Sequence, residues 1–234
     1  MNIWNPPIGS NQVFSLSQHW YLGGSGANTQ TAEVGWQVFP VFYNATSPVL
    51  FIYWTADNYQ QTGCYNLERP GFVQTNNAWP LGGALSTIST LGEQQYELEA
   101  AYLFAQGNWW LFIGGTDASN AIGYFPGSIY NNGVMATGAA EIDYGGEVVG
   151  TTSWPPMGSG AFAADGWQKA AYQRDIFYYP ADGSAAMNAA LQLSEQWPNC
   201  YTATMSNTDP SWGDTVYFGK PGGNNCPPTP PNSV

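Results

Sequence analysis

Short runs of β-branched and aromatic residues, each ended by Gly, Asn, Asp or Pro, recur along most of this chain. Such runs are typical of β-strands joined by tight turns, and their spacing suits antiparallel sheets. Lys and Arg together number 4 among 234 residues, too few to furnish the solvated faces of many helices. We therefore expect one all-β domain, with strands at Val34–Tyr43, Val49–Thr55, Gln95–Phe104, Trp109–Gly114, Glu141–Val149, Cys200–Met205 and Thr215–Phe218.

Two segments indicate how the sheets are layered. Residues 96–102 alternate polar and apolar, which predicts one face against a core and the other in water. Residues 49–54 are apolar on both faces, as expected of a central strand between two layers. Together they predict an antiparallel β-sandwich of two stacked, jelly-roll-like sheets, with a cleft on one sheet.

The ends of the chain differ in composition from its middle. We expect an irregular arm at residues 1–12, the folded domain at residues 13–227 and a proline-rich, extended tail at residues 228–234. The segment Ser184–Trp197 is the one helix candidate, because it is rich in Ala, Leu, Gln and Met and stops at Pro198. A loop lying on the sheet is the alternative for this segment.

The net charge of -12 narrows the partners that this chain can take. It would repel phosphate backbones, so we expect neither nucleic acid nor an anionic membrane as a partner. No run reaches the length of a membrane span, and Met1–Ser10 lacks the apolar stretch of a signal peptide. We expect a monomer that stays folded in acid, where the carboxylates lose their charge.

Cys200 and Cys226 lie in the same C-terminal region. A disulfide between them is plausible in an oxidising compartment, and it would leave Cys64 without a partner. Secretion to the extracellular space is therefore favoured, with any signal peptide absent from this chain.

Carboxylates are the catalytic side chains that this composition leaves available. With one His, three Cys and four cations, most metal, thiol and Ser/His chemistries lack their parts. His19 has no Gly-x-Ser-x-Gly elbow to accompany it, and we expect it to face solvent or to cap a backbone group. We expect no metal and no cofactor.

Glu33 lies in a strand pattern that gives it an accessible face. Alternation places Glu33, Gly35 and Gln37 on one side of the strand, opposite the apolar side that includes Trp36. Gly35 would leave bare backbone that another chain can approach closely. Taken alone, a solvated strand glutamate beside a turn explains Glu33 equally simply.

Glu147 repeats this arrangement, because Gly145 and Gly146 precede it and two valines follow it. A surface glutamate at a bulge or at a strand start is the simpler explanation for this segment alone.

The order of the aromatic and glycine motifs resembles the neprosin family. The match extends over roughly residues 18–227, nearly the whole chain, and so many ordered motifs rarely arise by chance. They are residues 33–38 (EVGWQV), 51–57 (FIYWTAD), 63–67 (GCYNL), 70–76 (PGFVQTN), 107–110 (GNWW), 145–148 (GGEV), 157–160 (MGSG), 199–201 (NCY), 212–213 (WG) and 221–223 (PGG).

The resemblance implies a secreted glutamic endopeptidase that cleaves after proline and has an antiparallel β-sandwich. By this resemblance, Glu33 and Glu147 correspond to the catalytic glutamate pair of the family. The family usually has a second cysteine where this chain has Arg69, so we expect Cys64 to be free or buried as a small apolar residue. Plant members also have a long pro-region before this domain.

The implied mechanism needs one proton shared between two carboxyl groups. We expect ionised Glu147 to activate water and protonated Glu33 to hydrogen-bond the scissile carbonyl, with the reverse roles left open, and activity to peak in acid. Gln37 is a candidate amide donor to the oxyanion, although a role as a cleft-wall residue is the more ordinary one.

Cleavage after proline requires a pocket for a rigid apolar ring, which aromatic faces supply. For each candidate the ordinary role is core packing. The candidates are Trp36, Trp54, Tyr65, Trp109, Trp110 and Tyr124.

Two alternatives remain open at this stage. Paired carboxylates and aromatic platforms also suit a glycoside hydrolase. A β-sandwich with exposed tryptophans suits a non-catalytic module that binds glycans or proline-rich peptides.

Overall fold

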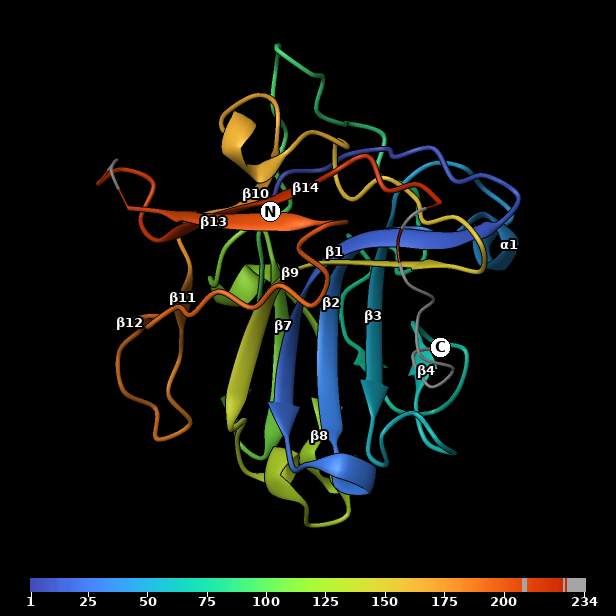
Figure 1. The fold of residues 1–234 in the computed structure, drawn as a ribbon. Helices are drawn as coiled ribbons and strands as arrows, with labels where there is room; N and C mark the ends of the chain where they lie inside the picture. The colour runs from blue at the N-terminus through green and yellow to red at the C-terminus, as the bar shows by residue number, and fades with distance from the viewer. Residues whose placement is uncertain (208–209, 225, 227–234) are drawn as a thin grey trace.

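The computed structural model describes residues 1–207, 210–224 and 226 and is almost entirely β-structure (Figure 1). The predicted tail at 228–234 lies outside the described residues. A five-stranded antiparallel sheet has the strand order β4-β3-β2-β1-β9. Its strands are β1 (Gln12–Gly23), β2 (Gln30–Val38), β3 (Val49–Thr55), β4 (Cys64–Tyr65) and β9 (Glu141–Gly150).

A four-stranded antiparallel sheet packs against the five-stranded one, which completes the predicted sandwich. Its order is β5-β8-β7-β6. Its strands are β5 (Val73–Gln74), β6 (Ala100–Ala105), β7 (Asn108–Ile113) and β8 (Ala121–Pro126).

Three further strands cross the top of the sandwich in Figure 1, in the order β10-β14-β13. A two-stranded ribbon pairs β11 with β12. These strands are β10 (Ala171–Gln173), β11 (Phe177–Tyr178), β12 (Met187–Asn188), β13 (Thr202–Ser206) and β14 (Thr215–Gly219). The helices are single turns: α1 (Pro40–Tyr43) and the 3₁₀ turns η1 (Gly26–Asn28), η2 (Ala118–Asn120), η3 (Gly127–Tyr130), η4 (Val134–Ala136) and η5 (Ala163–Asp165).

The core lies between the five- and four-stranded sheets and is rich in aromatic rings. Trp36 on β2, Tyr102 on β6 and Phe125 on β8 are almost completely buried there. The hydroxyl of Tyr102 donates to the backbone oxygen of Glu33 at 3.3 Å, and that of Tyr130 donates to Thr31 O at 2.9 Å. The second sheet and the turn η3, which follows β8, therefore bind the core side of β2 by hydrogen bonds as well as by apolar contact.

The other face of the five-stranded sheet points away from this core. We call it the glutamate face, and its members follow from the strand register, because residues directly opposite one another lie on the same side. They include Phe14, Leu16, Gln18 and Trp20 on β1; Thr31, Glu33, Gly35 and Gln37 on β2; Phe51 and Tyr53 on β3; Tyr65 on β4; and Asp143, Gly145, Glu147 and Val149 on β9.

The all-β fold class is confirmed, and the strand predicted at Val49–Thr55 has the bounds of β3. The strand predicted from Val34 begins earlier and ends at Val38, because Pro40 starts the turn of α1. Residues 95–99 precede β6 and meet the N-terminal arm through a bridge from Asn2 to Glu97. In that arm Met1, Ile3 and Trp4 are buried, so it packs into the core.

The helix predicted at Ser184–Trp197 is wrong. This segment contains the short strand β12 and is otherwise extended, with no helical residue. Most of its side chains are exposed, so a helix there would bury no apolar face. Helix propensity without such burial is marginal for a segment of this length.

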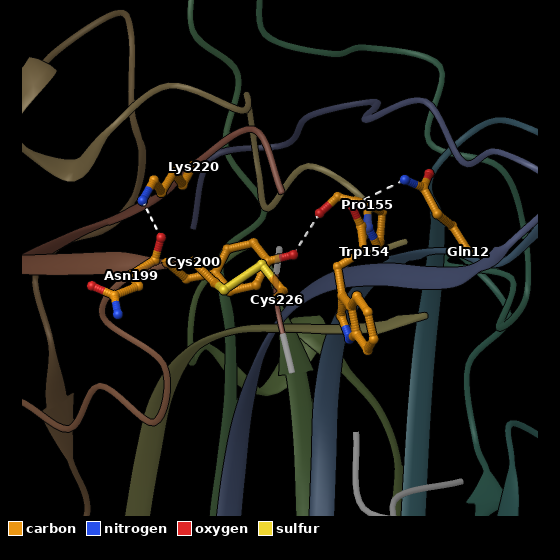
Figure 2. Close-up of a disulfide and its surroundings, with 8 residues drawn as sticks. Gln12, Trp154, Pro155, Asn199, Cys200, Lys220 and Cys226 are labelled. Carbon is orange, nitrogen blue, oxygen red and sulfur yellow. Dashed lines mark hydrogen bonds between the residues drawn. A yellow bond between two sulfur atoms is a disulfide. The ribbon is translucent and has the colours of Figure 1, made fainter. Parts of the chain in front are cut away.

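A disulfide joins Cys200 to Cys226, as predicted, with 5.6 Å between the Cα atoms (Figure 2). Beside it Lys220 donates to the backbone oxygen of Asn199, and the Tyr201 hydroxyl donates to Pro155 O at 2.8 Å. Cys64 is free and buried, as expected from Arg69 in the partner's place, and its thiol donates to Arg69 O at 3.5 Å.

Reduction of the Cys200–Cys226 disulfide should lower the melting temperature. The bridge closes a loop of 26 residues, for which the chain-entropy model gives about 3 kcal/mol. For a chain of this size that corresponds to a fall of roughly 6–12 °C. Differential scanning calorimetry with and without reductant measures the shift, and a Cys200→Ser/Cys226→Ser variant should show no further response to reductant. An unchanged melting temperature on reduction would contradict this expectation.

Candidate active site

Glu33 lies at the middle of β2, opposite Trp20 on β1 and Tyr53 on β3. Its side chain is 5% exposed. Two hydroxyl groups donate to the same carboxyl oxygen, Oε1: Thr31 Oγ1 at 2.7 Å and Tyr59 Oη at 2.8 Å. Because hydroxyl donors stabilise a carboxylate more than a carboxylic acid, this arrangement favours ionised Glu33.

The turn after β3 is built to bring Tyr59 onto Glu33. The carboxylate of Asp57 accepts hydrogen bonds from the backbone N–H groups of Gln60, Gln61 and Thr62, and from the Thr62 hydroxyl. Tyr59 itself has a left-handed backbone (φ 62°), a conformation that L-residues rarely adopt. Such strain, held in place by a hydrogen-bonded turn, is common at functional sites.

Glu147 lies on β9, opposite Leu16 of β1. Its side chain is partly exposed, and it makes no hydrogen bond to another side chain that the structure describes. The two glutamates are therefore two strands apart on the glutamate face, with different surroundings.

The electrostatics of the two carboxyl groups follow from those surroundings. Desolvation, and then repulsion from the charge of Glu33, raises the pKa of Glu147 to about 8. Desolvation also raises the pKa of Glu33, but the hydrogen bonds from Thr31 and Tyr59, with a weaker one from Gln18, oppose this rise. The two hydroxyl donors to Glu33, which Glu147 lacks, favour the state in which Glu33 is ionised and Glu147 holds the proton.

A groove with a volume of about 1020 Å³ runs along the outer edge of β9. That edge has no strand partner among the described residues. Residues 141–148 form one wall, with Glu147 among them, and residues 178–181 and 189–197 form another. Cys226 also lines the groove, so the disulfide in Figure 2 secures one end of this second wall. This groove corresponds to the predicted cleft. Its lining includes residues from both faces of β9.

Gly145 and Gly146 have different roles in β9. A Cβ atom on Gly145 would meet nothing within 4 Å, so bare backbone faces the groove beside Glu147. A Cβ on Gly146 would lie 2.7 Å from Phe218 Cε2, so this glycine serves core packing. Gly35 also serves packing, because a Cβ there would lie 2.0 Å from Ser17 O. The chain that approaches Gly35 closely is therefore β1.

Two of the predicted substrate-binding residues lie on the glutamate face. Gln37 Nε2 donates to the Tyr65 hydroxyl at 3.3 Å. Both residues adjoin a cluster that consists of Phe14, Leu16, Phe51 and Val149, with Trp20, Phe39, Tyr43, Tyr53 and Tyr65 packed against it.

The other five predicted substrate-binding residues lie elsewhere. Trp36 and Trp54 are buried in the core between the sheets, and Trp109 is buried there while it also lines the groove along β9. Trp110 and Tyr124 alternate with core residues, so they lie on the outer face of the four-stranded sheet, with ring centroids 4.5 Å apart.

Several residues of the site were not predicted from the sequence: Gln18, Trp20, Thr31, Tyr53 and Tyr59. Alternation in residues 31–38 already placed Thr31 on the side of Glu33. No local signal pointed to Tyr59, because its turn depends on the left-handed backbone. Trp20 and Tyr53 required the pairing of β1 and β3 with β2.

His19 is only partly exposed, in contrast to the expected solvent-facing position. It lies on the core side of β1, with its ring centroid 4.9 Å from that of Tyr144, and its Nδ1 is buried without a partner in the described structure. Burial lowers its pKa to about 3, so it is neutral at most pH values. No group of three or more His, Cys, Asp or Glu residues that could hold a metal occurs within residues 1–207, 210–224 and 226.

The fold and the site define an all-β sandwich with a pair of desolvated glutamates on the outer face of one sheet. A model of one protein family, described as Neprosin, matches residues 11–221. The chain belongs to the neprosin family. No helix in the described part of the chain is long and apolar enough to cross a membrane.

Proposed function

We propose that the protein is a glutamic endopeptidase that hydrolyses peptide bonds with Glu33 and Glu147. The observation that carries this proposal is the placement of two carboxyl groups on one face of the sheet, where Glu33 is held by two hydroxyl donors and Glu147 lines a groove. Hydrolysis without a nucleophilic side chain needs one base and one acid, and such a pair supplies both. Membership of the neprosin family supports a peptidase.

The surroundings of each glutamate favour roles opposite to those expected from the sequence. Ionised Glu33, with its Oε1 held by two hydroxyl groups, is the base that takes a proton from the attacking water. Protonated Glu147 hydrogen-bonds the scissile carbonyl oxygen as the carbon–oxygen bond to water forms. Glu147 then passes its proton to the departing nitrogen as the carbon–nitrogen bond breaks, which releases an amine and a carboxylic acid, and the proton taken up by Glu33 restores protonated Glu147.

The aromatic cluster beside Gln37 suits a proline ring on the acyl side of the cleaved bond. The rings of Tyr53 and Tyr65 are 4.7 Å apart and adjoin Leu16 and Phe51. Such a surface binds a rigid apolar ring at a low entropic cost. The disulfide is typical of oxidising compartments, which supports secretion.

Incubation with matched peptides tests the proposal. The peptides differ in one residue, with Pro, Ala or Leu before a common sequence, and mass spectrometry identifies the products across pH 3–9. We expect cleavage after proline. Polysaccharides serve as the comparison substrates: glycan hydrolysis without peptide hydrolysis would establish a glycosidase, and binding of proline-rich peptides without cleavage would establish a binding module.

The pH dependence of cleavage should have two limbs, and Tyr59→Phe should move one of them. Activity requires ionised Glu33 and protonated Glu147, so the alkaline limb should lie near pH 8, the pKa of Glu147, and activity should extend from acid into the neutral range. The Tyr59 hydrogen bond lowers the pKa of Glu33. Its loss should raise that pKa and shift the acid limb to higher pH, whereas the alkaline limb stays in place. Profiles of kcat/KM against pH check this, and an unmoved acid limb would refute the role of Tyr59.

A further inference from the structure

Gln18 occupies the position between the two glutamates on the glutamate face. Glu33 is opposite Trp20, and Glu147 is opposite Leu16. Gln18 lies midway between Leu16 and Trp20 on β1, so it is one diagonal step from each glutamate. Diagonal neighbours are within reach of long side chains. The Gln18 side chain is 1% exposed, so its polar atoms need partners inside the protein.

The nitrogen and the oxygen of the Gln18 carboxamide have different surroundings. Desolvation raises the pKa of Glu33, and the nearby Gln18 side chain opposes that rise. Only its amide nitrogen can act in this way, since an ionised carboxylate only accepts. The oxygen Oε1 is buried and has no donor within the described structure. A buried acceptor without a donor is costly, so such an atom calls for an explanation.

Glu147 offers the missing donor. Its carboxyl group makes no hydrogen bond to a described residue, and in its protonated form it carries one O–H group, which can be given to an acceptor of the protein before a substrate carbonyl takes its place. An acceptor without a donor and a donor without an acceptor therefore lie one diagonal step apart on the same face.

We propose that Gln18 is a positioning residue that links the two carboxyl groups: its Nε2 donates to ionised Glu33, and its Oε1 accepts the O–H of protonated Glu147. This inference rests on the proposed peptidase function. It adds which residue keeps the shared proton on Glu147. The reverse state would set the ionised Glu147 carboxylate against Oε1, which repels it. Gln18 thereby selects the state in which Glu33 is the base.

Gly35 holds this arrangement in place. It is directly opposite Gln18 in the register, and a Cβ atom at position 35 would lie 2.7 Å from both Cα and Cβ of Gln18. Glycine at this position lets β1 approach β2 closely enough for Gln18 to remain beside Glu33.

The other titratable groups around the pair are mostly neutral in the active range. The tyrosine pKa values are raised by burial, that of Tyr53 to about 12, so these hydroxyl groups stay protonated. Asp143 and Asp57 are exceptions. Desolvation and then Glu141 raise the pKa of Asp143 to about 6. In the Tyr59 turn, desolvation of Asp57 is outweighed by hydrogen bonds from Thr62, Gln61 and Gln60, which lower the pKa of Asp57. The groups are Tyr43 from α1, Tyr53 from β3, Asp57 and Tyr59 from the turn, Tyr65 from β4, Asp143 from β9, and Tyr102 and Tyr130 from behind β2.

Carbon-13 NMR titration of the glutamate carboxyl groups tests the proposal without any need for turnover. The variant Gln18→Leu removes both hydrogen bonds at nearly constant volume, and Glu33→Gln and Glu147→Gln assign the two signals. We expect the pKa of Glu33 to rise and that of Glu147 to fall, each by about half a unit or more. The two limbs of the pH profile should approach each other by the same amounts. An Asp143→Asn background removes the remaining titration.

The matched control is Gln37→Leu, since Gln37 is also a fully buried glutamine of this face with an unpartnered Oε1, but it is bonded to Tyr65. It should move neither carboxyl pKa comparably. Unchanged pKa values in folded Gln18→Leu would overturn the proposal, even if the protein cleaves peptides. Shifted pKa values in a protein that cleaves no peptide would refute the peptidase and retain the link.

A second measurement on the unmutated residue guards against failure of Gln18→Leu to fold. Infrared difference spectra between the wild type and Glu147→Gln isolate the C=O stretch of protonated Glu147. A frequency lowered by hydrogen bonding would support the link, whereas the frequency of a free carboxylic acid would overturn it.

Discussion

The variant Glu147→Gln should lose peptide hydrolysis while it remains folded. The amide cannot donate the proton that the departing nitrogen needs, and general acid–base groups typically contribute about 10²–10⁴-fold to the rate. Glu33→Gln should lose activity similarly, because water then has no base. We expect kcat to fall at least about 10³-fold in each variant, and the double variant to be little worse than either, since the two groups act as one unit.

The controls separate lost chemistry from lost structure. Glu147→Gln removes a carboxyl group whose raised pKa reports an unfavourable site for charge, so the melting temperature at neutral pH should stay level or rise. Glu68→Gln changes an exposed glutamate in the turn after β4 and should leave kcat unaltered. Near-normal cleavage by either Glu33→Gln or Glu147→Gln would rule out the pair as the catalytic groups.

The variants Gly145→Val and Gly146→Val should fail in opposite ways, although the two positions are adjacent. A side chain at position 145 enters open space over the groove, and Val suits a strand. Folding should therefore be preserved while kcat/KM falls at least about 100-fold, because the added methyl groups occupy the path of the substrate backbone. A side chain at position 146 meets Phe218 and Met157, and such overpacking costs about 1–3 kcal/mol.

Thermal unfolding and steady-state kinetics of both glycine variants test these two expectations. Gly145→Val should keep the wild-type melting temperature, and Gly146→Val should melt several degrees lower. If Gly145→Val cleaved peptides as fast as the wild type, the substrate would have to reach Glu147 by another route than the groove along β9.

The sequence predicted the sandwich and one side of the candidate site for clear physical reasons. Strand β2 alternates, so its pattern reports directly which residues face the core, whereas β3 is apolar on both faces. For this reason the pattern around Trp36 correctly put Glu33 and Gln37 on the opposite face.

Strand β1 was missed because its pattern is inverted. Ser15, Ser17 and His19 point inward, where Gln173 from β10 donates to Ser17 Oγ at 3.0 Å, and Phe14 and Leu16 point to the glutamate face. Polar residues that are satisfied inside and apolar residues that are covered by a separate cluster cannot be recognised from periodicity alone.

The aromatic candidates could not be placed individually, because alternation gives two faces without saying which one a distant strand will cover. Trp109 and Trp110 are adjacent and equally aromatic, yet one is in the core and the other lies on the outer face. Tyr59 could not be predicted as a partner of Glu33 either, since it lies in a turn whose shape is set by the carboxylate of Asp57.

The raised pKa values of Glu147 and Asp143 make the folding equilibrium depend on pH. The pKa of Glu147 moves from its ordinary value of 4.5 to about 8 in the folded chain, and that of Asp143 from 3.8 to about 6. Between those values the native state holds protons that the unfolded chain has released, so the free energy of unfolding falls as the pH rises through this interval. Folding is therefore coupled to proton uptake at Glu147 and Asp143 within this interval.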